Sequence, residues 1–138
     1  MKTDNKRASA QWRSSPPFYE HLGFVLDALT EGRATIRLPF EKHLGNSRSE
    51  VYGGAIATLA DAAMSQAVRS MIELGGAVAT ISLTVNYLAP ARGELICNGL
   101  VVRGGRSVVF AEAEVTDESG KPVCRASATY RLLPKKAT

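Results

Sequence analysis

The chain has 138 residues, 45% of them hydrophobic, which suffices for one domain that buries its core without disulfides or metals. Its net charge of +4 comes entirely from the two ends, residues 1–10 and 135–138, and the chain between them is neutral overall. A basic face for nucleic acid is therefore not indicated, and we expect no such partner.

The sequence offers little for metal or disulfide chemistry. Cys97 and Cys124 are isolated, and His21 and His43 are the two histidines, so no zinc-binding spacing exists. Residues 1–16 are polar, and no apolar run approaches membrane-spanning length. We expect a cytoplasmic protein with reduced thiols, without a metal and without a membrane partner.

The first quarter of the chain predicts an arm, a short helix and a hairpin. Residues 1–16 are interpreted as a flexible N-terminal arm in which Trp12 is the residue that docks. A short helix over 18–22 ends at a glycine. Period-two segments over 24–29 and 33–38, joined by Glu-Gly, predict a β-hairpin.

A long helix over 53–74 is the central prediction. Helix-favouring residues dominate this run, and a glycine pair follows it. The first two thirds are apolar nearly all round, which predicts burial on most sides. One stripe of small and polar residues interrupts that surface at spacings of three and four: Gly54, Thr58, Asp61 and Ser65. A carboxylate in the stripe of a buried helix is the first sign of a functional site.

Alternating segments after the helix predict four further strands, over 81–87, 95–101, 109–115 and 124–132. The inward faces of the last two are rich in alanine, and small side chains let a sheet approach a central helix closely. We therefore expect an α+β fold in which five to six antiparallel strands wrap one buried helix.

Short motifs frame this helix. Asn46 lies six residues before Tyr-Gly-Gly-Ala at 52–55, and Thr-Leu-Ala-Asp follows. Later come Thr80, then Asn-Tyr-Leu-Ala-Pro at 86–90 and Arg-Gly-Gly-Arg-Ser at 103–107. Over roughly residues 20–133 the chain resembles the hotdog-fold acyl-CoA thioesterases of the PaaI-like, phenylacetic-acid-degradation branch. The resemblance implies a hotdog fold, with subunits that pair as a homodimer or a dimer of dimers.

The resemblance also implies catalytic roles. Asp61 matches the family's catalytic acid, and Gly53 matches the residue whose backbone N–H binds the oxyanion, with Gly54 beside it. Asn46 matches the asparagine that helps to hold the thioester carbonyl or the attacking water. Thr80 matches a hydroxyl residue near the acid; simple alternation turns it away from the helix, so it needs a bulge or an interface to meet the carboxylate.

Substrate contacts follow from the same resemblance. Tyr52 stands where the family usually has a histidine that orients the thioester, and its hydroxyl can donate a hydrogen bond there. Ser49 stands where the family's loop often has glycine. Arg103, Arg106 and Ser107 are candidates for binding the nucleotide phosphates of coenzyme A, with solvated turn residues as the alternative.

General chemistry supports the assignment independently. Thioester hydrolysis needs an electrophilic clamp on the carbonyl oxygen and a base or nucleophile. N–H groups at a helix N-terminus suit a developing oxyanion, and glycine lets a substrate approach the backbone. A carboxylate among alanines is desolvated and therefore more basic.

The spacing along the helix makes a further demand. Gly53 and Asp61 are eight residues apart, so at a rise of 1.5 Å per residue they lie about 12 Å apart. The two residues of one chain are too far apart to act on the same carbonyl. If both are catalytic, each site combines Gly53 of one subunit with Asp61 of another, and we predict two shared sites in a dimer.

We predict an acyl-CoA thioesterase that converts an acyl- or aryl-CoA thioester to the free acid and coenzyme A. Asp61 activates water or attacks as a nucleophile, and no cofactor is expected beyond the coenzyme A of the substrate. The domain spans 17–134, and 135–138 form a basic tail.

Three alternatives stay open. The first is a non-catalytic binding protein for acyl-CoA or another small ligand, motivated by Tyr52. The second is a hotdog dehydratase or hydratase, a branch that needs a histidine near its aspartate, which the long helix lacks. The third is a purely structural oligomer, which leaves the carboxylate of the helix unexplained.

Overall fold

Six antiparallel strands form one sheet that curves around a single long helix. The computed structural model describes residues 11–134, so the first ten residues of the predicted arm and the predicted basic tail lie outside the described residues. In chain order the elements are α2 (Pro17–Leu22), β1 (Val25–Thr30), β2 (Arg33–Leu38), the short 3-10 helix η1 (Lys42–Leu44), α3 (Gly53–Arg69), β3 (Ala77–Tyr87), β4 (Leu95–Gly104), β5 (Val108–Thr116) and β6 (Pro122–Leu133). The strand order is β1-β2-β4-β5-β6-β3, which places β1 and β3 at the two edges.

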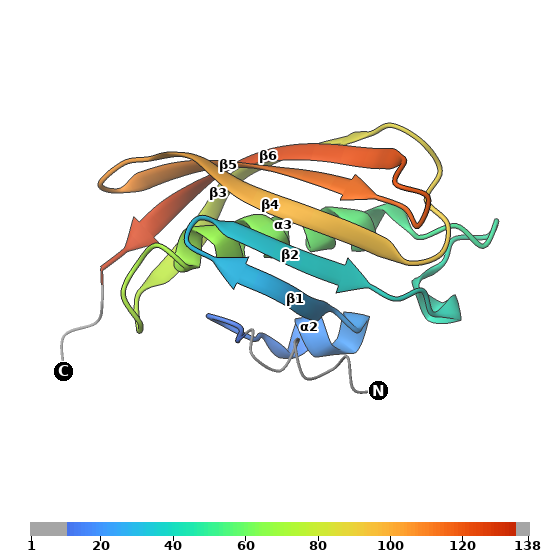
Figure 1. The fold of residues 1–138 in the computed structure, drawn as a ribbon, viewed down its shortest axis with the longest axis horizontal. Coiled ribbons are helices and arrows are strands. Elements are labelled where there is room, and N and C mark those ends of the chain that lie inside the picture. The colour runs from blue at the N-terminus through green and yellow to red at the C-terminus, as the bar shows by residue number, and fades with distance from the viewer. Residues whose placement is uncertain (1–10, 135–138) are drawn as a thin grey trace.

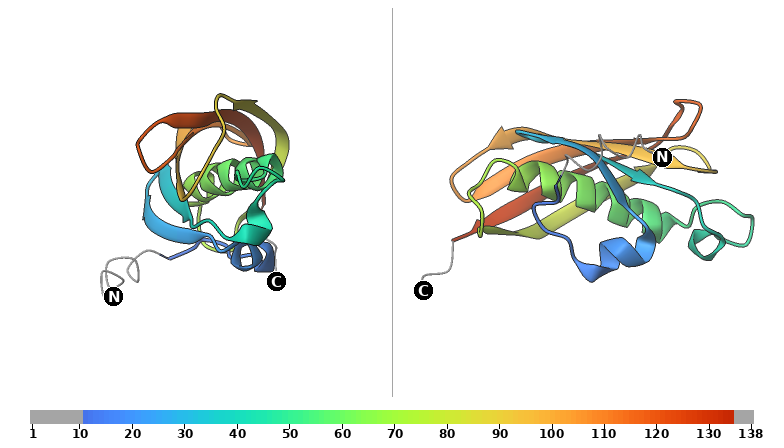
Figure 2. Two further views of the ribbon diagram at one scale, coloured as in Figure 1. Left: turned by 90° about the vertical axis from the view of Figure 1, so that its right-hand side faces the viewer. Right: turned by 60° about the horizontal axis from the view of Figure 1, so that its bottom comes forward.

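The predicted hotdog fold is confirmed. Helix α3 runs along the concave side of the sheet (Figure 1). Viewed end-on, the sheet encloses α3 from above and from one side, and α2 lies across the side that the sheet leaves open (Figure 2). The curvature follows from the twist that antiparallel strands accumulate.

Small side chains let α3 lie directly on the sheet. A Cβ atom added at Gly99 of β4 would lie 2.6 Å from the carbonyl carbon of Ala63, so the helix backbone touches the strand there. The inward alanines of β5 and β6 are all buried, as predicted: Ala111, Ala113, Ala126 and Ala128. Larger residues along these faces would push the helix away from the sheet.

A β-bulge in β1 changes the face that alternation predicts. The register against β2 shifts between Leu26 and Ala28. As a result Ala28 is exposed, although alternation from Leu26 places it inward, and Leu29 packs against the core instead. The extra residue, Asp27, forms an ion pair with Arg37 on β2 at 2.9 Å.

A second bulge, in β3, has functional consequences. The register against β6 shifts between Thr80 and Ser82, so Ile81 is the extra residue and is 56% exposed. Thr80 lies opposite the buried Tyr130 and shares its inward face, whereas strict alternation had grouped Ile81 with the inward residues of this strand. The bulge therefore turns a hydroxyl group toward α3.

Helix α3 ends at Arg69, short of the predicted end at residue 74. The hydroxyl of Ser70 donates to the Ala67 carbonyl oxygen at 2.6 Å and accepts a hydrogen bond from Gly32 N–H at 2.8 Å. Met71 N–H then bonds only three residues back, to Val68. A serine that engages the backbone in this way tightens and ends the last turn.

The N-terminal segment crosses α3, and the predicted docking of Trp12 is confirmed. Its ring lies 5.2 Å, centroid to centroid, from that of Tyr19 in α2. The buried Gln66 of α3 accepts a hydrogen bond from Arg13 N–H at 2.8 Å and donates one to the Ser14 carbonyl oxygen at 2.9 Å. Residues 12–14 are thus attached to the helix.

Candidate active site

Two hydroxyl groups from the sheet hold Asp61, in the middle of α3. Its Oδ1 atom accepts a hydrogen bond of 2.6 Å from the Tyr130 hydroxyl of β6 and one of 3.1 Å from Oγ1 of Thr80 on β3. The predicted proximity of Thr80 to Asp61 is realised through the bulge. Asp61 is half-buried, and its Oδ2 atom has no hydrogen-bond or ion-pair partner among residues 11–134. Oδ1 is therefore held by two hydrogen bonds, and Oδ2 is available to react.

Two tyrosines lie close to this carboxylate. Burial, reinforced by the negative charge of Asp61, raises the pKa of Tyr130 far above its usual range. Burial, and then the charge of Asp61, raise the pKa of Tyr19 to about 12. Both phenols therefore stay protonated at neutral pH, and Tyr130 stays a hydrogen-bond donor. Tyr130 is not among the residues selected from the sequence; its signal is a polar-tipped aromatic residue on the inward face of an alanine-rich strand.

Helix α3 begins with two uncapped glycines. The first helical N–H groups that bond back to the chain are those of Ala55 and Ile56, at 3.0 and 3.2 Å from the Tyr52 carbonyl oxygen. No side chain caps this helix start. The N–H groups of Gly53 and Gly54 therefore have no acceptor in the part of the chain that the structure describes. They lie at the positive end of the helix dipole, an arrangement that favours a negatively charged ligand atom.

An apolar pocket of about 350 Å³ opens beside this helix start, lined by Phe18, Leu22, Leu44, Tyr52, Ala55 and Thr58 among others. Tyr52 is 61% exposed, and its ring covers Gly54, where an added Cβ would lie 3.2 Å from the ring. On the other side the Tyr87 hydroxyl donates to the Gly53 carbonyl oxygen at 2.7 Å. Tyr52, Gly53 and Gly54 thus lie together, about 12 Å along the helix from Asp61.

Asn46 orders the loop that precedes α3. Its Oδ1 atom accepts from the N–H groups of Arg48 and Glu50 at 2.8 and 3.0 Å, and its Nδ2 atom donates to Oε1 of Glu50 at 3.1 Å. This Asn46 bond, more than the ion pairs with Arg48 and Arg92, holds the pKa of Glu50 below its usual range against the opposing effect of burial. One Nδ2–H is left for another acceptor, so a contact of Asn46 with substrate stays a prediction.

The backbone of this loop is strained at one position. Ser49 has φ of 61°, in the left-handed region that glycine reaches without a steric penalty. This conformation accounts for the glycine that the resembling family often has there. The departure at Ser49 therefore places a non-glycine residue in a strained backbone conformation of this loop.

The turn between β4 and β5 lies at the opposite end of the molecule from the start of α3 (Figure 1). Arg103, Arg106 and Ser107 are exposed there. Arg106 borders a cavity of about 300 Å³ together with Ile72, which follows the end of α3. Within one chain the turn does not meet Gly53, so phosphate binding by these residues stays a prediction about an assembled site.

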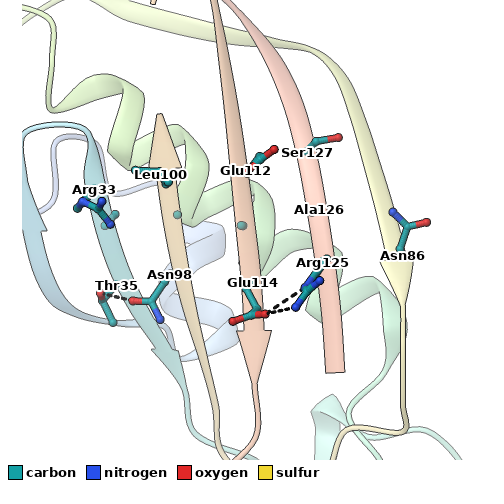
Figure 3. A pocket seen from close by; sticks show the side chains of 13 residues that line it. Arg33, Thr35, Asn86, Asn98, Leu100, Glu112, Glu114, Arg125, Ala126 and Ser127 are labelled. Carbon is teal, nitrogen blue, oxygen red and sulfur yellow. Dashed lines mark hydrogen bonds and ion pairs between the residues drawn. The ribbon is translucent and has the colours of Figure 1, made fainter. Parts of the chain in front are cut away.

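A groove of about 610 Å³ lies on the face of the sheet away from α3 (Figure 3). Two pairs of its polar side chains bond each other: Glu114 pairs with Arg125 at 3.0 Å, and Thr35 donates to Asn98 at 2.7 Å. A polar surface of this kind is typical of the solvated face of an antiparallel sheet. Size alone does not make this groove the functional site.

The described residues offer no grouping of three or more metal-ligating side chains. Cys97 and Cys124 are both buried and free, and burial raises the pKa of each thiol, which keeps them protonated and unreactive. None of the described helices is long and apolar enough to cross a membrane. The start of α3 and Asp61 are therefore the candidate positions for chemistry in this chain.

Comparison with known proteins points to the same helix. The sequence matches the Thioesterase superfamily over residues 50–124, which contain the start of α3 and Asp61. A candidate esterase of Halobacterium salinarum, VNG_1336C, is 41% identical over 99 residues, covering 68% of this chain and 66% of that protein. The 1,4-dihydroxy-2-naphthoyl-CoA hydrolase of Listeria monocytogenes is 24% identical, with coverage of 85% and 96%.

Solved structures show the same fold. The conserved protein PA5202 from Pseudomonas aeruginosa is 30% identical and superposes with a TM-score of 0.83 over 88% of this chain and 97% of that one. The PaaI protein of the Escherichia coli phenylacetic acid degradation operon reaches 0.82 at 21% identity, covering 90% of this chain and 89% of that one. At 21% identity, the likeness to the PaaI protein shows a shared fold and no more.

Proposed function

The chain belongs to the thioesterase superfamily, and we propose that it is an acyl-CoA thioesterase that hydrolyses an acyl- or aryl-CoA thioester. One observation carries the proposal: a single helix bears both an uncapped glycine N-terminus and, two turns on, a carboxylate with one free oxygen. The first suits a developing oxyanion and the second suits a nucleophile or base, which are the two requirements of thioester hydrolysis.

The two parts act together when two copies of the chain pair. Edge strand β3 has eleven residues and exposes Ile81, Leu83 and Tyr87, with Leu88 exposed just beyond its end. An apolar edge strand of this length is a template for pairing with another strand. A two-fold axis beside β3 brings two α3 helices antiparallel, so that Asp61 of one subunit faces Gly53 of the other. The assembly is a homodimer, or a dimer of such dimers.

Either route through Asp61 consumes one water molecule. As a nucleophile, Oδ2 adds to the carbonyl carbon, the C–S bond breaks, coenzyme A leaves as a thiolate that is then protonated, and water cleaves the resulting anhydride. As a base, Oδ2 takes a proton from water while the water oxygen adds to the carbonyl, and that proton passes to the departing thiolate. In both routes negative charge develops on the carbonyl oxygen, where the N–H groups of Gly53 and Gly54 stabilise it.

The pocket beside Tyr52 suits the acyl part of the substrate. Its volume of about 350 Å³ and its apolar lining fit an aromatic ring or a medium-length chain better than a long one. The thioester then lies near the helix start, where Tyr52 and Gly54 line the pocket. A contact of the remaining Asn46 N–H with the thioester is part of this proposal. Coenzyme A extends outward from there, and no other cofactor is required.

The test is steady-state hydrolysis of benzoyl-, phenylacetyl-, hexanoyl- and palmitoyl-CoA. We expect Asp61→Asn to lower kcat by about 10² to 10⁴, because a carboxamide neither attacks nor accepts a proton. Asp117→Asn, in an exposed turn, is the matched control and keeps the wild-type rate. Equal rates for Asp61→Asn and the wild type would remove Asp61 from its role.

The second candidate function is a non-catalytic binding protein for acyl-CoA thioesters, favoured by Tyr52 in place of the family's histidine. In that case titration calorimetry gives saturable binding of the same thioesters, and incubation releases no free thiol above background. Thiol release by the wild type, abolished in Asp61→Asn, rejects this candidate.

A further inference from the structure

Three hydroxyl or carboxyl groups meet on the inward side of the sheet, and one of them, Tyr130, has no role in the account so far. Tyr130 is fully buried, and its hydroxyl lies 2.6 Å from Oδ1 and 3.1 Å from the backbone oxygen of Asp61. A phenol carries one proton to donate. The shorter, charge-assisted contact takes that proton, so the bond to the carboxylate is the one that matters.

The sheet aims two donors at the same oxygen. Thr80 and Tyr130 are cross-strand neighbours on β3 and β6, and both donate to Oδ1. The bulge at Ile81 makes this possible, because it turns Thr80 to the face that Tyr130 already occupies. Two donors on Oδ1 fix the rotation of the carboxylate about its Cβ–Cγ bond. They leave Oδ2 as the oxygen that faces away from the sheet hydroxyls.

From this geometry we propose that Tyr130 is a positioning residue of the hydrolytic site, which with Thr80 anchors Oδ1 of Asp61 and assigns Oδ2 to the reaction. The inference rests on the proposed function for the identity of the reaction, although the hydrogen bond itself does not. Tyr130 touches no substrate because it is sealed beneath α3. It acts through Asp61 by holding the carboxylate in one rotamer.

The neighbourhood of the carboxylate makes the effect of Tyr130 separable. The charge of Asp61 contributes to the raised pKa of Tyr130 on β6 and of Tyr19 on α2. The hydrogen bonds to the Asp61 carboxylate within residues 11–134 come from Tyr130 and Thr80, and Tyr19 makes none. Tyr19→Phe is therefore the matched control for Tyr130→Phe, since each removes one phenol hydroxyl near Asp61 at constant ring size.

The experiment measures kcat and KM for wild type, Tyr130→Phe, Thr80→Val and Tyr19→Phe, with circular dichroism as the check on folding. We expect Tyr130→Phe to lower kcat about tenfold with KM unchanged, because the carboxylate loses its shorter hydrogen bond. Thr80→Val, at an exposed position, lowers kcat by less, again with KM unchanged. Tyr19→Phe keeps the wild-type kcat and KM.

A wild-type kcat in both Tyr130→Phe and Thr80→Val overturns the proposal, as does a rise in KM in place of the fall in kcat. A crystal structure of the wild type separates this result from a failure of the proposed function. If the wild type hydrolyses no thioester, the proposed function fails. A structure in which Tyr130 and Thr80 both lie within hydrogen-bond distance of one oxygen of Asp61 then still supports the anchoring, and a structure in which they do not refutes it.

Discussion

The turn of α3 that carries Asp61 and the turn that begins the helix differ in how far the chain completes them by itself. Around Asp61 the chain supplies both donors to Oδ1, from two strands, and surrounds the carboxylate with the buried Tyr130 and the partly buried Tyr19. At the helix start the N–H groups of Gly53 and Gly54 have no acceptor among the described residues, and Tyr52 and Tyr87 are more than half exposed. The part of the proposed site around Asp61 is therefore assembled within one chain. The part at the helix start is completed only by a ligand and a second copy of the chain.

After that of Asp61→Asn, the largest expected effect comes from removing one N–H group at the start of α3. Gly53→Pro deletes that donor while keeping the helix, because proline is favoured at the first helical position and Tyr52 already has the extended backbone, φ −64° and ψ 139°, that a following proline requires. We expect kcat to fall by about 10² to 10³, the cost of one oxyanion donor. Circular dichroism checks that the helix content is unchanged.

Gly53→Ala is the matched control for this variant, because it keeps the N–H group. An added Cβ there makes only ordinary contacts, at 3.4 Å, with the Tyr87 ring. A smaller loss in Gly53→Ala than in Gly53→Pro assigns the effect to the N–H group. Losses of equal size would instead point to crowding of the substrate.

The surroundings of Asp61 are expected to affect the stability of the protein at alkaline pH. The pKa of Tyr19 is raised to about 12 by burial, then by Asp61, so the folded state holds its proton where the unfolded chain, titrating near pH 10, has released it. The contribution of Tyr19 to the free energy of unfolding is therefore fully present below pH 10. It is lost as pH rises toward 12, which lowers the free energy of unfolding by on the order of 2 kcal/mol. Urea unfolding at pH 9 to 12 measures this fall.

Tyr19→Phe provides the reference for the alkaline prediction, because it removes the titrating group and keeps the ring. The wild type should lose more stability than the variant over the same pH range. Equal losses in the free energy of unfolding for the two proteins would mean that the Tyr19 hydroxyl beside Asp61 is less buried than its contacts indicate.

The smallest expected effect is a change in stability caused by the loop that precedes α3. Ser49→Gly relieves the left-handed backbone at φ 61°, and we expect the free energy of unfolding to rise by about 0.5 to 1 kcal/mol after the entropic cost of glycine is deducted. Chemical denaturation measures the gain. Unchanged kcat in the same variant would confirm that the loop position is structural, and a destabilised protein would contradict the strain.

Much of this arrangement could be predicted from the sequence. The spacing of Gly53 and Asp61, the polar stripe and the alternating strands fix a long helix inside a curved sheet, because burial and periodicity are local properties. The bulge at Asp27 could not be predicted, since an inserted residue reverses strand faces without leaving a mark on hydrophobicity. A bulge near Thr80 was one of two ways in which the resemblance could bring that residue to Asp61, and the strand pattern alone did not choose between them.

The environment of Asp61 was harder to foresee than its role. Tyr130 follows it by 69 positions, and only the pairing of β3 with β6 brings that hydroxyl beside Thr80. The Asn46 contacts escaped prediction for a different reason: an amide can serve its own loop or a ligand equally well, and only the folded backbone decides. These contacts depend on which residues the fold brings together, and composition and periodicity do not reveal that.

The most direct test of the shared site mixes the two inactive variants, Asp61→Asn and Gly53→Pro, after unfolding and refolding them together. Each mixed dimer would combine the intact Gly53 of one chain with the intact Asp61 of the other at one of its two sites. Random pairing then restores about a quarter of wild-type activity per subunit. Activity no greater than that of the two parent proteins would contradict the account.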